Sequence, residues 1–168
     1  MKASREAEYT EYVRGRLDWL RRTAYLLCKD LHGADDLVQT AITRLYTHWG
    51  RARGASNLDA YARTILIRVF LDERGSAHSR KVALTKSGTV DDHPTRAHDH
   101  DSAMDIQQAL QGLPPRQRAT VVLRFYCDLN VEETAAALGV SKGTVKSQTA
   151  KAIETLRTTL IPTWNEAA

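Results

Sequence analysis

The chain has 168 residues, of which 42% are hydrophobic and 26% are charged, and its formal net charge is +4. This is enough for one ordinary domain or two small ones with a buried core. Mild basicity suits a partner of nucleic acid or acidic protein, although a solvated basic surface fits equally well. No apolar run approaches the roughly 18 residues of a membrane span, and the N-terminus lacks a secretory signal, so we expect a cytoplasmic protein.

Apolar residues recur every three or four positions through the first part of the chain, which predicts helices. A first helix is expected up to His32-Gly33, with Leu31 in its apolar stripe, and a second over residues 34–49. The second opens with acids, which the helix dipole favours in a first turn. After a basic loop, a third helix is expected over residues 58–74. Three such helices can form one bundle, so residues 1–75 are predicted as a first domain.

The helical periodicity fails between Gly75 and Ala103, where Ser, Thr, Gly, Asp and His dominate. Residues 81–105 hold three basic and five acidic side chains, a net charge of −2. We therefore expect a flexible acidic linker over residues 76–104. Its histidines, His93, His98 and His100, have no spacing that would fix metal ligands, and no metal or cofactor is predicted.

A second helical domain is expected over residues 105–163, followed by a short tail over 164–168. Its first helix stops at Pro114-Pro115, and Pro115 suits the first position of the next helix. That helix is expected to carry Ala119, Val122, Leu123 and Tyr126 inward, while a final helix ends at Pro162.

The residues before the final helix have the pattern of a helix-turn-helix unit. Asn130 and Glu133 predict a capping box at the start of one helix, and Gly139 suits the left-handed stop at its end. Ser141 is a favourable N-cap for the final helix. A short helix, a glycine turn and a capped second helix are typical of DNA-binding proteins.

One face of the final helix is small, polar and basic, and its opposite face is apolar. Such a face fits the major groove, where hydroxyl and amide groups can reach base edges and lysines can neutralise phosphates. The alternative is an ordinary solvated amphipathic helix, which the preceding helix and glycine turn disfavour. The predicted face consists of Lys142, Gly143, Thr144, Lys146, Ser147, Gln148 and Lys151.

Four stretches of the sequence resemble one bacterial protein family. LPPRQRATVVLRFY (113–126) and ETAAALGVSKGTVKSQTAKAIETLR (133–157) are similar to region 4 of extracytoplasmic-function (ECF) sigma factors. GADDLVQTAITRLY (33–46) resembles their region 2.2, and NLDAYARTILIRVFLDER (57–74) resembles regions 2.3 and 2.4, with an ending similar to actinobacterial members. The two modules stand in the right order and cover nearly all of the chain outside the linker and tail.

The resemblance implies an all-α fold of two small helical domains joined by a flexible linker. It also implies an alternative sigma factor without catalysis, which binds core RNA polymerase, recognises a promoter and helps to open it. Region 2.2 would dock on the clamp helices of the largest polymerase subunit, and the flap region would be a further polymerase contact of the protein. The alternative for this helix is that its acids simply cap it and its arginine is solvated. The docking candidates carried over are Asp35, Asp36, Leu37, Gln39, Ile42, Arg44 and Leu45.

The basic loop and the helix after it would meet the −10 element. Holding single-stranded DNA needs cations along the backbone and a pocket for a flipped base. The alternative is a solvated basic face with Tyr61 in the core. Many relatives carry Asn at the position of Arg68, which leaves the base preference at −10 open. The candidates are Arg51, Arg53, Ser56, Asn57, Tyr61, Arg63, Arg68 and Arg74.

Region 4 would read the −35 element with the polar face of the final helix. Relatives usually carry Arg where this chain has Gln148, and fewer cations predict weak binding by the isolated module. Arg116, Arg118 and Arg124 are candidate phosphate contacts, with surface solubility as the alternative.

Further partners follow from the resemblance. Relatives are often held inactive by an anti-sigma factor, and the terminal Ala167-Ala168 resembles tags read by Clp-type proteases, with a frayed end as the alternative. In the polymerase complex the protein would be nucleoid-associated.

A competing function is a free-standing helix-turn-helix regulator that uses residues 1–75 for dimerisation or sensing. An enzyme is not expected, because no phosphate loop, metal pair or nucleophile–base set is present in the sequence.

Overall fold

The computed structural model describes the backbone over residues 2–85 and 102–166, and the side chains over 2–74 and 106–160. Every element in these ranges is helical, as the sequence predicts. The elements are α1 (Lys2–Leu27), α2 (Leu31–Thr47), α3 (Trp49–Ala52), α4 (Leu58–Thr85), α5 (Ser102–Gln111), α6 (Pro115–Val121), a π-helical turn η1 (Val122–Tyr126), α7 (Val131–Leu138) and α8 (Lys142–Glu166).

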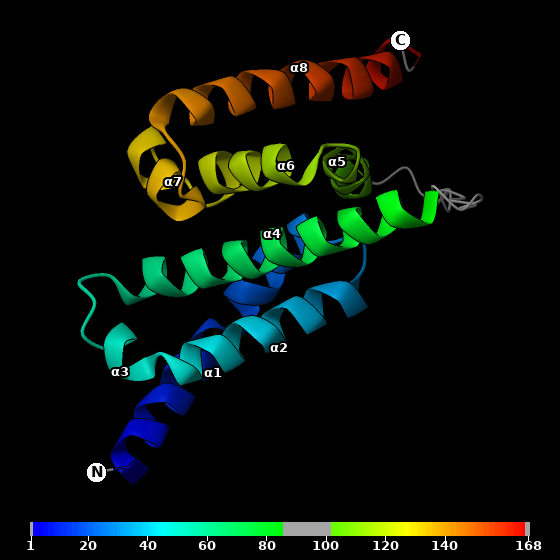
Figure 1. The fold of residues 1–168 in the computed structure, drawn as a ribbon. Helices are drawn as coiled ribbons and strands as arrows, with labels where there is room; N and C mark the ends of the chain where they lie inside the picture. Colours follow the sequence, from blue (N-terminus) through cyan, green and yellow to red (C-terminus); the bar gives the residue numbers. More distant parts are fainter. Residues whose placement is uncertain (1, 86–101, 167–168) are drawn as a thin grey trace.

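The helices form two packed groups (Figure 1). The first group comprises α1 to α4, and the second comprises α5 to α8. Helices α6 and α7 lie between α4 and α8, and α5 and α6 also contact α1. One hydrophobic cluster runs through both groups: Leu27, Leu66 and Phe70 of the first share it with Val122 and Leu123 of the second. The two predicted modules are thus present, and in this structure they share a core.

Two helix boundaries differ from the sequence-based expectation near residue 30. Helix α1 ends at Leu27 rather than at His32-Gly33, because Asp30 is an N-cap whose Oδ1 accepts a hydrogen bond of 2.7 Å from the Gly33 amide. The expected stripe residue Leu31 belongs to α2 instead and is 69% exposed. The side chain of Asp30 caps the start of a new helix here. The spacing of apolar residues alone does not indicate such a boundary.

Two other helices extend further than expected. Helix α4 continues to Thr85, eleven residues beyond Arg74, so the first part of the expected linker is helical. Its backbone needs no apolar stripe to stay helical, and this extension contains good helix formers and no proline. Helix α8 continues to Glu166, past Pro162, which removes one backbone donor without ending the helix. Residues 86–101, with the linker histidines, and Ala167-Ala168 lie outside the described residues.

The π-helical turn η1 corrects the expected orientation of Tyr126. Ala119, Val122 and Leu123 are buried as predicted, but Tyr126 is 45% exposed. The Cys127 amide donates to the carbonyl of Val122, five residues earlier. This wider turn rotates Tyr126, its last residue, away from the core face.

The helix-turn-helix unit is built by the predicted caps. The Glu133 amide donates to Asn130 Oδ1 at 2.7 Å, and the Asn130 amide donates to Glu133 Oε1 at 3.2 Å. Gly139 has a φ of 68°, and the Thr144 amide donates to Ser141 Oγ at 3.1 Å. These local interactions set the start of α8 and hence the direction of its polar face.

Arg118 is buried at the junction of the two groups and is only 5% exposed. Its Nη1 donates to the carbonyl of Leu27 at 2.7 Å, and its Nε donates to the carbonyl of Leu110 at 2.8 Å. Its Nη2 donates to the carbonyls of Leu113 and Gln111. Burial lowers the pKa of Arg118 to about 10, which still leaves the guanidinium charged at neutral pH. The structure therefore removes Arg118 from the candidate phosphate contacts, because all its described contacts lie in the protein interior.

Two glutamines of α5 extend this contact to the end of α1. Gln107 Nε2 donates to the carbonyl of Tyr25 at 3.1 Å, and Gln111 Nε2 donates to the carbonyls of Leu26 and Cys28. The last carbonyls of a helix have no partner within it, and an unmade buried hydrogen bond is costly. The second group therefore caps the C-terminus of α1.

A second link ties α1 to the start of α4. Asp59 Oδ1 accepts hydrogen bonds of 2.8 Å from both the Tyr12 hydroxyl and Arg16 Nε, and its Oδ2 accepts from Arg16 Nη2. The hydrogen bonds from Arg16 hold the pKa of Asp59 below its ordinary value, against the opposing effect of partial burial. This network fixes the first turn of α4 beside the basic loop.

Replacing Arg118 tests the junction. We expect Arg118→Met to lower the free energy of unfolding by about 2–4 kcal/mol, because it leaves several buried carbonyls without donors. Urea denaturation measures this change. The exposed Arg116 on the same helix provides the control: Arg116→Met should stay within about 0.5 kcal/mol of the unaltered protein. Equal midpoints for the two variants would contradict the assigned role of Arg118.

The Asp59 network predicts a pH dependence. A carboxyl whose pKa is lowered by folding stabilises the protein above its unfolded pKa of about 3.9, and this contribution is lost as the pH falls through the folded pKa. Asp59→Asn should therefore flatten the loss of stability below about pH 4, and cost less than about 1 kcal/mol at pH 7 because the pair is partly exposed. Acid titration of the circular dichroism signal tests this. The same titration of Asp18→Asn, at an exposed position of α1, should retain the full acid-dependent loss.

Candidate nucleic-acid interface

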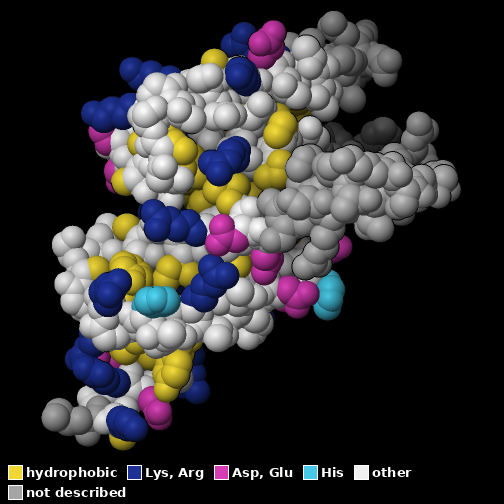
Figure 2. All heavy atoms as spheres, in the orientation of Figure 1, with side chains coloured by type: hydrophobic (Ala, Val, Ile, Leu, Met, Phe, Trp, Pro, Cys, Tyr) yellow, Lys and Arg dark blue, Asp and Glu magenta, His cyan; other side chains and the backbone are white. Residues whose placement is uncertain are grey.

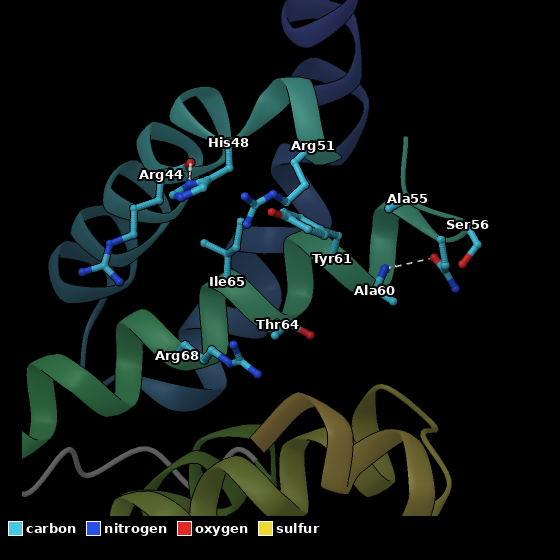
Figure 3. Close-up of a pocket in the computed structure, with 11 residues that line it drawn as sticks. Arg44, His48, Arg51, Ala55, Ser56, Ala60, Tyr61, Thr64, Ile65 and Arg68 are labelled. Atoms are coloured by element: carbon cyan, nitrogen blue, oxygen red, sulfur yellow. Dashed lines mark hydrogen bonds between the residues drawn. The ribbon is translucent and has the colours of Figure 1, made fainter. Parts of the chain in front are cut away.

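A cavity of about 490 Å³ opens between α2, α3 and α4 (Figure 3). Five of the eight −10 candidates line it: Arg51, Ser56, Asn57, Tyr61 and Arg68. The structure thus brings together side chains from the basic loop and from the helix after it, as the sequence predicts. The remaining lining residues are Arg44, His48, Ala55, Ala60, Thr64 and Ile65.

The cap at the start of α4 positions this lining. Asn57 Oδ1 accepts a 3.0 Å hydrogen bond from the Ala60 amide, which fixes the first turn. Residues three or four apart on a helix share a face, so Tyr61, Ile65 and Arg68 project toward the same cavity. In Figure 3 the hydroxyl end of Tyr61 points toward the Arg51 side chain.

Arginine side chains line this cavity together with partly apolar side chains. Arg51 and Arg68 are exposed, and neither forms an ion pair within the described residues. Arg44 lies 3.5 Å from Asp72, with both side chains about half exposed, so that attraction is weak. Tyr61 and Ile65 are half-buried and pack against the neighbouring core. Guanidinium groups beside an aromatic ring can hold the phosphate and base of one nucleotide.

The other three −10 candidates lie elsewhere. Arg53 forms a 2.9 Å ion pair with Glu8 of α1. The guanidinium of Arg63 lies over the Trp19 ring, 5.1 Å from its centroid. Arg74 lines a separate cavity of about 440 Å³ between α4 and the second group. These three side chains pack within the protein or lie on a different surface. None of them lines the cavity between α2, α3 and α4.

The polar face of α8 has the predicted exposure. Six of its seven residues are exposed, and Gln148 is half-buried where it lines the cavity that also contains Arg74. Val145 and Ala152 on the opposite face are fully buried. Lys142 lies 3.3 Å from Glu132 of the preceding helix. Lys146 and Lys151 are the lysines of this face that form no ion pair among the described residues. Contact of this face with DNA remains a prediction.

Of the candidate phosphate contacts in region 4, only Arg116 is free at the surface. Arg118 is buried, and Arg124 donates from Nη1 to the carbonyl of Leu129 at 2.6 Å. Figure 2 shows basic side chains spread over both groups on one face, with hydrophobic side chains between them.

The docking candidates on α2 divide into surface and core. Leu37 and Leu45 are each 1% exposed and belong to the hydrophobic core, because α2 packs against both α1 and α4. Ile42 is half-buried against the same core. Only Asp35, Asp36, Gln39 and Arg44 are exposed, and Arg21 Nε lies 3.3 Å from Asp35 Oδ1. Burial therefore excludes Leu37 and Leu45 as surface contacts in this conformation, and docking of α2 on polymerase remains a prediction.

Two features of the surface were missed by sequence reasoning. His48 lines the cavity between α2, α3 and α4, and no motif in the sequence indicated this position. Ile106, Phe125 and Tyr126 are exposed around an apolar groove of about 300 Å³ between α5, η1 and α8. That groove depends on the rotation caused by the π-helical turn, which no sequence pattern indicated.

The described residues form neither a metal cluster nor a membrane span. Among them there is no group of three or more His, Cys, Asp and Glu residues placed to hold a metal ion. No helix in the described part of the chain is long and apolar enough to cross a membrane.

Comparison with known proteins gives the same two-part division. The Sigma-70 region 2 family matches residues 12–80, and the Sigma-70 region 4 family matches residues 109–158. The RNA polymerase sigma-E factor of Streptomyces avermitilis is 40% identical over 152 residues, which cover 89% of this chain and 83% of that protein. The ECF RNA polymerase sigma factor SigL of Mycobacterium tuberculosis is 32% identical over 150 residues, with 84% and 82% covered.

Solved structures share the fold. The sigma factor RpoE of Bartonella quintana, determined in complex with the anti-sigma factor NepR, matches with a TM-score of 0.72 and 26% identity over 91% of this chain and 96% of that one. CnrH, determined with the cytosolic domain of CnrY, matches with a TM-score of 0.67 at 17% identity, covering 94% and 90%. Both sequence modules, their order and the fold agree, and the chain belongs to the ECF family of RNA polymerase sigma factors.

Proposed function

We propose that this sigma factor binds its promoter at two sites. The cavity between α2 and α4 binds a flipped nucleotide of the −10 element, and the polar face of α8 binds the −35 element. The observation that carries this proposal is the cavity itself, which Arg51, Tyr61 and Arg68 all line. A sigma factor directs core polymerase to promoters without catalysis of its own, so its residues need only bind, orient and separate DNA strands.

The cavity suits single-stranded rather than double-stranded DNA. A base must leave the duplex stack before it can enter a pocket between helices, and the unstacking costs a few kcal/mol. Stacking on an aromatic ring and phosphate contact with guanidiniums offset that cost. Binding in the cavity therefore favours the opened promoter.

The −35 contact is expected to be weak on its own. Lys146 and Lys151 are the exposed cations that remain beside Thr144, Ser147 and Gln148. Few phosphate contacts give a shallow salt dependence and modest affinity. Polymerase then supplies much of the stability of the promoter complex by holding both DNA contacts together. It docks on α2 through Asp35, Asp36 and Gln39.

Additional partners form part of this proposal. The apolar groove around Phe125 is open with respect to the described side chains and fits the apolar face of a helix, which we assign to the flap region of polymerase. An anti-sigma factor is proposed by analogy with RpoE, which was solved with NepR. We further propose a cytoplasmic protein, nucleoid-associated in the polymerase complex, with Ala167-Ala168 as a signal for a Clp-type protease.

Transcription with purified core polymerase tests binding at the two sites. On a promoter selected from a random library, Tyr61→Ala should reduce initiation about 5- to 100-fold, as expected for loss of one base-stacking contact. A template already unpaired at −10 should recover most of this loss, because melting is then no longer required. Lys146→Ala should instead lower the salt slope of binding by about 1 on either template.

The control is Arg22→Ala, an exposed change on α1 outside the cavity, which should leave initiation unchanged. A chain that binds DNA but never produces specific transcripts with core polymerase would instead be a free-standing helix-turn-helix regulator. Equal activity of Tyr61→Ala and the unaltered protein on the duplex template would refute the cavity as the −10 site.

A further inference from the structure

We infer that His48 sets the base preference of the −10 cavity, selecting the amino bases adenine and cytosine over the keto bases guanine and thymine. This inference rests on the proposed function, in which the cavity takes one flipped base. It adds a specificity-determining residue that the sequence did not suggest and that lies on α2's C-terminal cap rather than on the DNA-reading helix.

The tautomer of His48 follows from its hydrogen bond. Its Nδ1 lies 2.9 Å from the carbonyl oxygen of Arg44, as drawn in Figure 3. A carbonyl oxygen can only accept, so Nδ1 carries the hydrogen. In the neutral ring Nε2 then has a lone pair and no hydrogen, and it acts as an acceptor. No contact of Nε2 with another described residue competes for that lone pair.

The rest of the lining is rich in donors. The guanidiniums of Arg44, Arg51 and Arg68 donate and cannot accept. Asn57 has an acceptor oxygen, but that oxygen already caps the Ala60 amide at 3.0 Å. Rotating hydroxyls such as those of Ser56, Tyr61 and Thr64 can donate or accept, so they do not discriminate. Among the described side chains of the lining, His48 Nε2 is therefore the fixed acceptor that makes no hydrogen bond within the protein.

Bases differ at the position that such an acceptor would meet. Adenine and cytosine carry an amino donor at N6 or N4, whereas guanine and thymine carry an acceptor oxygen at O6 or O4. An amino group can donate to His48 Nε2, while a keto oxygen would face its lone pair. One such hydrogen bond corresponds to a preference of about 5- to 10-fold. Phosphate contacts with the arginines are the same for all four bases and do not alter the preference.

The test is transcription by holoenzyme from a promoter library randomised through the −10 element, followed by sequencing of the initiating templates. With the unaltered protein, one position should be enriched about 5- to 10-fold in adenine and cytosine over guanine and thymine. His48→Ala should equalise the two classes at that position. His48→Arg replaces the acceptor by donors and should shift the preference toward guanine and thymine.

His32→Ala is the matched control, because His32 is exposed at the opposite end of the same helix, where its Nε2 lies 3.5 Å from Asp36. It should leave the base frequencies unchanged. Frequencies unaltered by both His48 variants, at every −10 position, would overturn the inference while leaving the proposed function intact. If the proposed function itself fails, the unaltered protein gives no specific initiation and Tyr61→Ala gives no defect, which is a different result.

Discussion

Side chains of the second group of helices close the C-terminus of α1 by donating hydrogen bonds to its last carbonyls. The rest of the structure depends on this closure. The carbonyls of Tyr25, Leu26 and Leu27 accept hydrogen bonds from Gln107, Gln111 and Arg118. These residues come from α5 and α6, so the end of one module is completed by side chains of the other. A positive guanidinium at this end also complements the negative pole of the helix dipole.

This closure and the shared core place both DNA-reading surfaces. The core residues of α1 hold α2 and α4 beside each other, and the cavity lies between those two helices. Asp59 adds a second attachment at the start of α4, where the loop side chains enter the cavity. In the second group, the buried side chains of Val122 and Leu123 support the positions of α7 and α8. Geometry at each candidate site thus depends on packing well away from it.

Features that arise from neighbouring residues were predictable from sequence. The capping box at Asn130, the left-handed Gly139 and the cap at Ser141 need only local hydrogen bonds, and all are present as predicted. The exposed face of α8 followed because a buried stripe dictates the opposite side of the same helix. Five of the eight −10 candidates meet because they lie on α3, on the loop directly after it and on one face of α4.

Features that arise from distant contacts were not predictable. Leu37 and Leu45 match the family's docking helix, but α2 lies between α1 and α4 and buries both side chains. Arg118 has the composition of a surface residue, and only tertiary structure shows the carbonyls that satisfy it. His48 enters the cavity because α2 ends beside α4, a juxtaposition that no spacing along the chain encodes. Asp30, by contrast, was a local signal that the apolar periodicity obscured.

The closure of α1 also imposes an order on folding during synthesis. Arg118 follows Leu27 by 91 residues, so the ribosome completes α1 long before the donor for its last carbonyls exists. At roughly 5–20 residues per second, this interval is about 5–20 s. During that time water must hydrate the end of α1, and closing so long a loop is a slow, entropically costly step. The first helix to be made is thus among the last to be finished, and a nascent chain stopped within the linker would leave its end open.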